Sequence, residues 1–220
     1  MNVRSLIRSL LVLVPAAALA GEVSGQARLL GPAPAAAARP TDKDQSVCGP
    51  SQPDESVRVS GGGLEDVVVR IEVPGQRAAP RALVLDQRGC RYLPRVQAAS
   101  PGSTLTLRNA DPVLHNVHGW LGPATAFNVP MPTQDGAVAR TLARPGVIRV
   151  GCDVHAWMAA YLVVTDSPFV AVTGAGGGFA IPGVPEGSWQ AVAWHERYGE
   201  KRVIVTVPAS GPAVLRLEYP

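Results

Sequence analysis

Short runs of Val, Ile and Leu, interrupted every few residues by Gly or Pro, restrict this chain to folds made of many short strands. The 220 residues include 23 Gly and 21 Pro. Residues 67–73 form a dense β-branched run, and apolar residues alternate with polar ones around Leu105 and Leu107. Turn signals such as Gly61-Gly62-Gly63 separate these runs. The pattern is typical of sandwiches and Greek-key barrels, and it predicts an all-β protein with almost no helix.

The first 20 residues have the layout of a secretory signal peptide. Arg4 and Arg8 precede an apolar run from Leu10 to Ala20, which ends in the small-residue pattern Ala18-Leu19-Ala20. That run is shorter than the ~20 residues that a bilayer span requires. We therefore expect cleavage after Ala20, a mature protein with no transmembrane segment, and a periplasmic or secreted location. A retained N-terminal anchor is the alternative.

The charge balance gives no support for a nucleic acid or an anionic membrane as partner. Cleavage after Ala20 removes two Arg and no acidic residue, so the net charge falls from +3 to +1. No block of Lys or Arg stands out in the sequence, whereas such blocks are typical of proteins that bind phosphate-rich surfaces.

Composition and pattern divide the mature chain into three parts. Residues 21–46 are rich in Ala, Pro and Gly, lack a sustained periodicity, and are predicted to be a flexible linker. Residues 47–166 contain the first group of strands. Residues 167–220 contain about five more, with a clear alternation in the last one. Because so short a unit buries little surface, we expect it to pack against the first domain.

Three cysteines remain after cleavage: Cys48, Cys90 and Cys152. If two of them form a disulfide in an oxidising compartment, the third has no cysteine partner. We predict a disulfide between Cys48 and Cys90, because Cys152 lies in a segment that suits metal binding. A disulfide that involves Cys152 is the alternative, since spacing alone does not determine connectivity.

The segment that suits a metal is GVIRVGCDVHAWMAAYLVV, residues 146–164. Ile148, Val150 and Cys152 share one face of a predicted strand, so the strand directs Cys152 inward at its end. A short loop then supplies His155 and Met158 before the β pattern resumes. A tight loop between two strands can bring a thiolate, an imidazole and a thioether around one point.

A second imidazole is available upstream, in the segment NADPVLHNVHGW over residues 109–120. Two His, one Cys and a weak axial Met form the trigonal site that suits both Cu(I) and Cu(II). Zinc is the alternative metal, but it rarely takes a thioether and is usually bound by Cys, His and carboxylate ligands. We therefore predict one copper ion, with the ligands His115, Cys152, His155 and Met158.

These motifs resemble those of the cupredoxins, in particular the amicyanin and plastocyanin type. The resemblance is carried by His115-Asn116-Val117-His118, by Cys152-x2-His155-x2-Met158, and by the 37 residues that separate His115 from Cys152. It covers roughly residues 56–165, and it implies a Greek-key sandwich with the same four copper ligands. It also implies that Asn116 ties the two ligand loops together, because hydrogen bonds of this kind fix the orientation of metal ligands.

The C-terminal part carries a second resemblance. Residues 168–220, with GAGGGFAIPGVPEGSWQAVAWH, resemble the carboxypeptidase-regulatory-like (transthyretin-like) β-sandwich. The whole arrangement resembles bacterial cupredoxin proteins of the methylamine-utilisation type. The Cys48 and Cys90 pair and this second sandwich are not features of amicyanin.

Other residues in these segments have simpler interpretations. His118 faces away from His115 if the segment is extended, and is predicted to be a structural or surface residue. His195 is predicted to be a turn residue rather than a metal or partner contact. Trp157, inside the ligand loop, either shields the metal from water or belongs to a docking patch.

The absence of other chemistry favours an electron carrier over an enzyme. No Ser-His-Asp order, phosphate-binding loop or paired-carboxylate motif lies on a suitable element, and four histidines are too few for a second catalytic copper centre. We expect an unidentified redox protein as partner and electron exchange at an exposed imidazole edge, that of His155. Copper delivery or storage is the alternative function, as is a non-redox binding role for the second sandwich.

Overall fold

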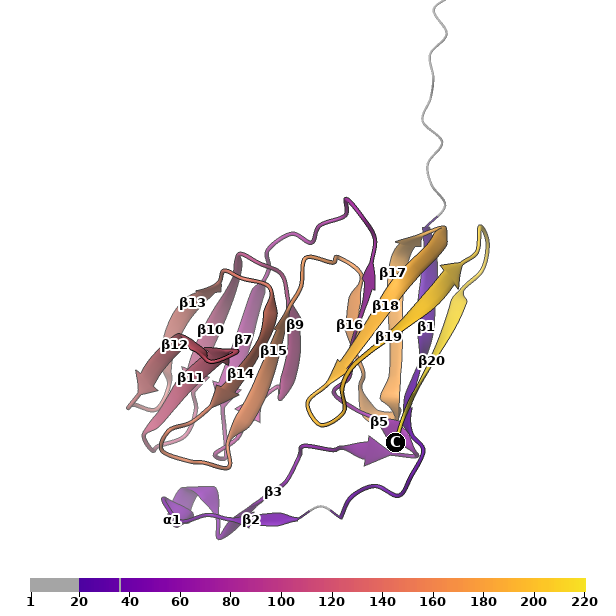
Figure 1. The fold of residues 1–220 in the computed structure, drawn as a ribbon. Helices are drawn as coiled ribbons and strands as arrows, with labels where there is room; N and C mark the ends of the chain where they lie inside the picture. Colours follow the sequence, from indigo (N-terminus) through magenta and orange to yellow (C-terminus); the bar gives the residue numbers. More distant parts are fainter. Residues whose placement is uncertain (1–19, 36) are drawn as a thin grey trace, which may run out of the picture.

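The computed structural model describes residues 20–35 and 37–220, which form two β-sandwiches side by side (Figure 1). The all-β prediction is confirmed, because helix in these residues is limited to α1 (Gln45–Cys48) and a 3-10 turn, η1 (Ala175–Gly177). In the described part of the chain, no helix has the length and apolar character to cross a membrane. The predicted signal peptide falls on residues 1–20, of which 1–19 lie outside the described residues.

The first sandwich contains the predicted copper motifs. One of its sheets has the order β13-β10-β7-β8, formed by β7 (Ala82–Gln87), β8 (Tyr92–Leu93), β10 (Ser103–Asn109) and β13 (Gly136–Leu142). The other has the order β12-β11-β14-β15-β9, formed by β9 (Val96–Ala99), β11 (His115–Leu121), β12 (Ala124–Met131), β14 (Gly146–Gly151) and β15 (Ala159–Val164). Alternate residues of both sheets, among them Leu105, Leu107 and Val150, form one buried apolar core.

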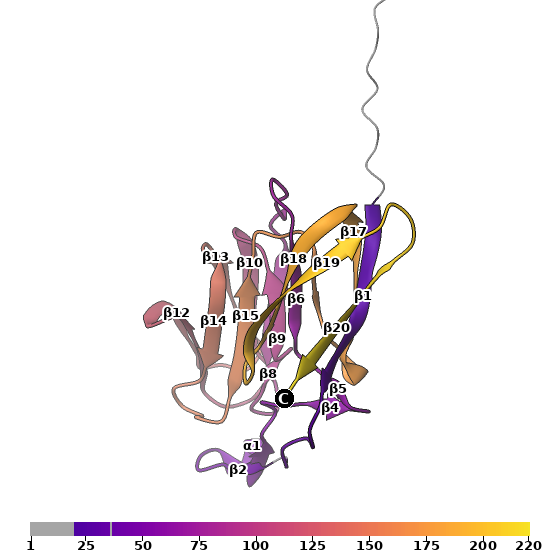
Figure 2. The same cartoon turned by 45° about the vertical axis from the view of Figure 1, so that its right-hand side comes forward.

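The second sandwich draws its strands from three parts of the chain. One sheet has the order β17-β1-β5-β4, with β20 beside β1; it contains β1 (Ala20–Leu29), β4 (Val59–Ser60), β5 (Gly63–Leu64), β17 (Gly178–Pro185) and β20 (Ala213–Tyr219). The other has the order β16-β6-β18-β19 and contains β6 (Val68–Glu72), β16 (Val170–Val172), β18 (Gly187–His195) and β19 (Gly199–Val207). Figure 2 shows the same two units after a turn about the vertical axis.

The prediction of a flexible linker over residues 21–46 is wrong at its start, because β1 occupies residues 20–29. This strand runs parallel to β20 and antiparallel to β17, with Val23 and Ala27 completely buried. Its period-two pattern is weak because Gly25 stands at an inward position. A Cβ at Gly25 would lie 1.8 Å from the carbonyl oxygen of Leu215, so the close approach of the two backbones requires glycine there.

The predicted boundary between residues 47–166 and 167–220 also differs from the structure. Residues 59–72 belong to the second sandwich, where β6 pairs with both β16 and β18. The physical reason is burial: the C-terminal strands alone would leave their inner faces exposed, and β1 and β4 to β6 provide the missing partners.

The two sandwiches are in contact, as expected, through Val68, Val96, Ala98 and Val163. The chain between β1 and β4 runs below both of them and forms a small hairpin of β2 (Ala38–Pro40) and β3 (Ser51–Pro53) around α1 (Figure 1). The predicted disulfide between Cys48 and Cys90 is present and joins α1 to the turn after β7. Cys152 is free and buried, which removes the alternative pairing.

Candidate metal centre

A tight loop between β14 and β15 places three of the four predicted ligands. The two strands are antiparallel and pair up to Gly151 and Ala159, so residues 152–158 must turn within a short distance. Cys152 is the first residue of this loop and is 6% exposed. The backbone N–H of Met158 donates to the carbonyl of His155 at 3.0 Å, which closes the turn.

His115 reaches the same place from β11. This strand lies beside β14, with His118 opposite Gly151, so the start of β11 faces the loop that follows β14. His115 is completely buried, in keeping with its position on the inner face of the sheet. Sheet pairing therefore joins two segments that are far apart in the sequence.

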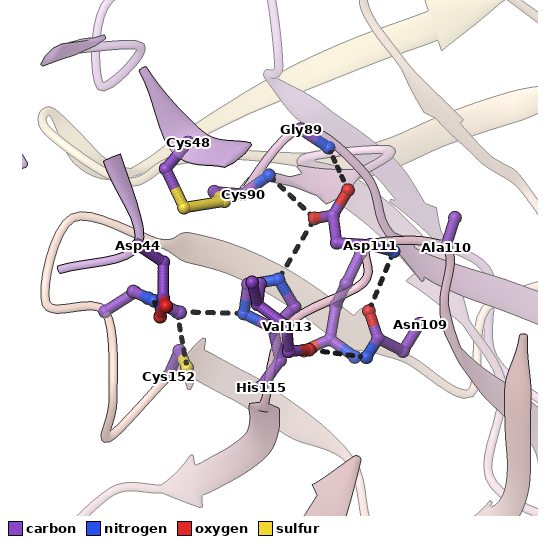
Figure 3. Close-up of polar contacts among 12 residues, drawn as sticks. Asp44, Cys48, Gly89, Cys90, Asn109, Ala110, Asp111, Val113, His115 and Cys152 are labelled. Carbon is purple, nitrogen blue, oxygen red and sulfur yellow. Dashed lines mark hydrogen bonds and ion pairs between the residues drawn. A yellow bond between two sulfur atoms is a disulfide. The ribbon is translucent and has the colours of Figure 1, made fainter. Parts of the chain in front are cut away.

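The three strongest donor atoms converge. The Nδ1 atoms of His115 and His155 are 2.9 Å apart, and the sulfur of Cys152 lies 3.8 Å from Nδ1 of His155 (Figure 3). One donor atom from each residue lies within 4.8 Å of the others. Met158 is 3% exposed and belongs to the same apolar core as Cys152. The prediction that residue 115 and residue 152 meet is confirmed.

Two carboxylates that sequence reasoning missed bind the outer nitrogens of the two histidines. Nε2 of His115 lies 3.0 Å from Oδ2 of Asp111, and Nε2 of His155 lies 2.9 Å from Oδ2 of Asp44. Asp111 also accepts hydrogen bonds from the backbone N–H groups of Gly89 and Cys90, at 2.7 and 2.8 Å (Figure 3). Asp111 lies in the turn between β10 and β11, and Asp44 lies in the segment predicted to be a linker.

These contacts test whether the site suits a cation. An ionised carboxylate only accepts hydrogen bonds, so each Nε2 carries the hydrogen, and in a neutral ring the lone pair is then on Nδ1. The two Nδ1 atoms therefore direct lone pairs toward each other across 2.9 Å. Two acceptors at this distance repel, and a cation bound by both relieves the repulsion. The donor set and its geometry fit a soft metal ion.

Burial keeps His115 ready to act as a ligand. Desolvation lowers the pKa of His115, and the hydrogen bond to Asp111 opposes this shift only in part. A lowered pKa favours the neutral ring, which is the form that binds metals.

Asn116 makes the contacts expected of a residue between the two ligand segments. Its side-chain oxygen accepts a hydrogen bond from the backbone N–H of Asp153 at 2.6 Å, directly after Cys152. Its amide nitrogen donates to the side chains of Asn128 and Asp153. These hydrogen bonds tie the loop that carries Cys152 to β11, and Asn128 of the neighbouring strand β12 takes part in them.

His118 lies on the other face of β11, as predicted. It shares Asp153 and Asn128 with Asn116, and its ring stacks on Trp120 with centroids 3.7 Å apart. His195 is the last residue of β18, directly before the turn to β19, in keeping with the prediction of a turn residue; it is 1% exposed and packs against Tyr198 and Tyr219.

The expectation of an exposed imidazole edge at His155 is wrong. His155 is completely buried, because Asp44 covers Nε2 and the half-buried ring of Trp157 lies 4.9 Å away, centroid to centroid. The indole N–H of Trp157 donates to the carbonyl of Cys90 at 3.2 Å. Trp157 thus shields the ligand loop.

The sequence contains a different signal for each of the two carboxylates, Asp111 and Asp44. Asp111 precedes His115 by four residues, so a turn between β10 and β11 can return its carboxylate to the ring. For Asp44 the signal is indirect: it lies four residues before Cys48, and the disulfide brings that segment to Cys90.

No protein-family model and no curated protein matches this sequence. Among solved structures, amicyanin from Paracoccus versutus is 25% identical over 43% of this chain and 86% of that chain, with a TM-score of 0.35. A purple cupredoxin from Nitrosopumilus maritimus is 20% identical over 38% of this chain and 99% of that chain, with a TM-score of 0.34. A Cu-containing nitrite reductase from Thermus scotoductus is 19% identical over 44% of this chain, with a TM-score of 0.36, and the match spans only 25% of the reductase. At these scores the neighbours assign no family.

Proposed function

We propose that this protein binds one copper ion through His115, Cys152, His155 and Met158 and transfers single electrons between redox partners. The observation that carries the proposal is the convergence of two imidazole nitrogens and one thiol sulfur in a buried cluster, with both imidazoles oriented by carboxylates. A thiolate and a thioether suit Cu(I), and imidazoles suit both oxidation states. When bound, copper would supply a centre that accepts and returns one electron.

The protein's contribution is a site that is closed and held in place. The exposed fractions of the four side chains lie between 0 and 6%. Asp111 and Asp44 fix the two rings, and Asn116 fixes the loop of Cys152. A rigid site changes little between the two oxidation states, which favours electron transfer. Burial of all four side chains also separates them from solvent, which favours a carrier over an enzyme.

Copper loading of the purified protein tests the proposal. We expect Cu(II) to produce an intense thiolate-to-copper absorption and the EPR spectrum of a mononuclear site at one copper per chain. Cys152→Ser should abolish the absorption while circular dichroism shows an intact β-fold. Survival of the colour in Cys152→Ser would refute the ligand assignment.

Two histidines on the same strand provide a matched comparison. His115→Ala should lose the spectrum, whereas His118→Ala should retain it, because His118 lies on the opposite face of β11 with its own partners. Equal effects of the two substitutions would exclude His115 as a specific ligand.

Export to the periplasm or beyond is part of the proposal. Cleavage after Ala20 would leave the inward residues of β1, from Val23 onward, in their register with β20. Mass spectrometry of the exported protein tests this: an N-terminus at Gly21 is expected, and a chain that retains residues 1–20 would support the anchor instead.

We infer that the C-terminal strands belong to a carboxypeptidase-regulatory-like sandwich, on the motif in residues 174–195. Its role in the carrier is to support the first sandwich, since the two share a buried contact.

A further inference from the structure

The side of the candidate metal centre at His155 is covered by a segment that we name the strap, residues 41–53. The strap contains α1 and β3, and it lies below the first sandwich in both ribbon views (Figure 1, Figure 2). Among the described residues of the strap, only Asp44 has a side chain that forms a hydrogen bond with one of the proposed ligands.

Several contacts hold the strap in this place. The disulfide joins Cys48 to Cys90, and the side chain of Gln52 donates to the carbonyls of Cys48 and Gly89. The backbone N–H of Thr41 donates to the carbonyl of Pro50 at 3.1 Å, which closes the strap on itself. The strap is therefore fixed to the first sandwich at the turn that also binds Asp111.

Asp44 has an unusual role at the start of α1. An Asp at this position normally accepts a hydrogen bond from a backbone N–H of the first helical turn. Here the side chain makes no capping hydrogen bond, and the residue adopts a left-handed conformation with φ 49°. Its carboxylate instead accepts from Nε2 of His155 at 2.9 Å. The local geometry directs the carboxylate to the histidine rather than to the helix.

We propose that Asp44 is a positioning residue that holds His155 with Nδ1 toward the copper, and that the strap excludes water from this side of the site. The proposal rests on the proposed function. Carboxylates that bind the outer nitrogen of a histidine ligand fix its tautomer and raise its basicity, and their loss typically costs 10–100-fold in metal affinity. An added consequence is that partner proteins do not reach the imidazole edge of His155.

The test compares Asp44→Ala and Asp44→Asn with Asp42→Ala. Asp42 is an exposed acid two residues away in the same strap, so its removal changes the charge equally and leaves the hydrogen bond intact. The first measurement uses metal-free protein: NMR of the imidazole groups should show a slowly exchanging Nε2–H of His155 in wild type and in Asp42→Ala. That signal should exchange rapidly in Asp44→Ala.

The second measurement uses the Cu(II)-loaded full chain. Competition with a chelator should show copper affinity lower by about 10–100-fold in Asp44→Ala. Water-proton relaxation should rise in the same variant, because water reaches the metal. Asp44→Asn, which keeps an acceptor, should recover part of both losses, and Asp42→Ala should match wild type.

The outcomes separate this proposal from the function it rests on. If wild type binds no copper but retains the protected Nε2–H, the proposed function fails and the role of Asp44 in orienting His155 stands. If wild type binds copper and Asp44→Ala matches Asp42→Ala in affinity and relaxation, the role of Asp44 is overturned and the copper site stands.

Discussion

At the scale of residues, four histidines of similar appearance in the sequence have different roles because their partners differ. His115 and His155 each present Nε2 to a carboxylate and Nδ1 to a common point. The side chain of His118 is 15% exposed and lies 3.1 Å from the carboxylate of Asp153, which is on the surface. His195 is buried, and its Nδ1 accepts from the backbone N–H of Arg197 at 3.2 Å. The meeting of the two Nδ1 atoms, rather than a carboxylate partner alone, distinguishes the two candidate ligands from His118 and His195.

His195 should make the protein sensitive to acid. Burial lowers the pKa of His195 to about 4 from the ordinary 6.5. Since the unfolded chain binds this proton more readily, the stability contribution is complete above pH ~6.5 and is lost as the pH falls toward 4. Between pH 7 and 5 we expect a loss of about 2 kcal/mol in the free energy of unfolding.

Urea denaturation at the two pH values measures this loss. His195→Phe should remove most of the difference, because the replacement does not titrate. A variant with the same pH dependence as wild type would mean that another group causes the acid sensitivity.

At the scale of elements, the Cys48–Cys90 disulfide joins the segment that carries Asp44 to the turn that binds Asp111. Asp44 lies at the start of α1, which ends in Cys48, and Asp111 accepts a hydrogen bond from the backbone N–H of Cys90. The carbonyl of Cys90 accepts from Trp157 of the ligand loop. This disulfide therefore connects the strap, the turn after β7 and the ligand loop around one site.

Removal of the disulfide should weaken both the fold and the site. It closes a loop of 42 residues, and Cys48→Ala with Cys90→Ala should cost about 2–4 kcal/mol of unfolding free energy. The freed strap should also release Asp44, so water-proton relaxation by bound Cu(II) should rise. Denaturation curves and relaxation measurements check the two effects, and an unchanged relaxation would show that the remaining contacts hold the strap without the disulfide.

At the scale of the whole molecule, a buried ion pair links the sandwiches. Arg95 donates to both carboxylate oxygens of Glu196, at 2.7 and 2.9 Å, and the two side chains are 9 and 6% exposed. The chain also passes from the second sandwich to the first and back, since β1 and β4 to β6 precede the first sandwich in sequence. We therefore expect the two units to unfold together.

Loss of one partner of this pair should be costly. Arg95→Met leaves the carboxylate of Glu196 buried without a partner, and should lower the unfolding free energy by about 3–5 kcal/mol. The double variant with Glu196→Leu should recover most of the loss. Arg77→Met is the matched control: its pair with Asp166 is 79 and 48% exposed, and its loss should cost less than ~1 kcal/mol. Chemical denaturation compares the three.

The sequence by itself determined the all-β class, and it predicted the Cys48–Cys90 disulfide and the meeting of His115 with the Cys-x2-His-x2-Met loop. The all-β class and the inward position of Cys152 depend on period-two patterns and on short loops, which are local and can be read from neighbouring residues. The choice of His115 rested on the ligand types that suit copper and on the resemblance to cupredoxins. The disulfide followed from the odd number of cysteines once Cys152 was assigned to a metal site.

Only the tertiary structure decided the place of β1, the division into two sandwiches, and the carboxylate partners of the histidines. β1 pairs with β20 at the opposite end of the described chain, and its glycine at an inward position hides the pattern. Asp44 and His155 are 111 residues apart, and their hydrogen bond exists because the disulfide holds the strap beside the loop between β14 and β15. A local pattern reports which face a side chain occupies, whereas the packing of distant segments determines what that side chain touches.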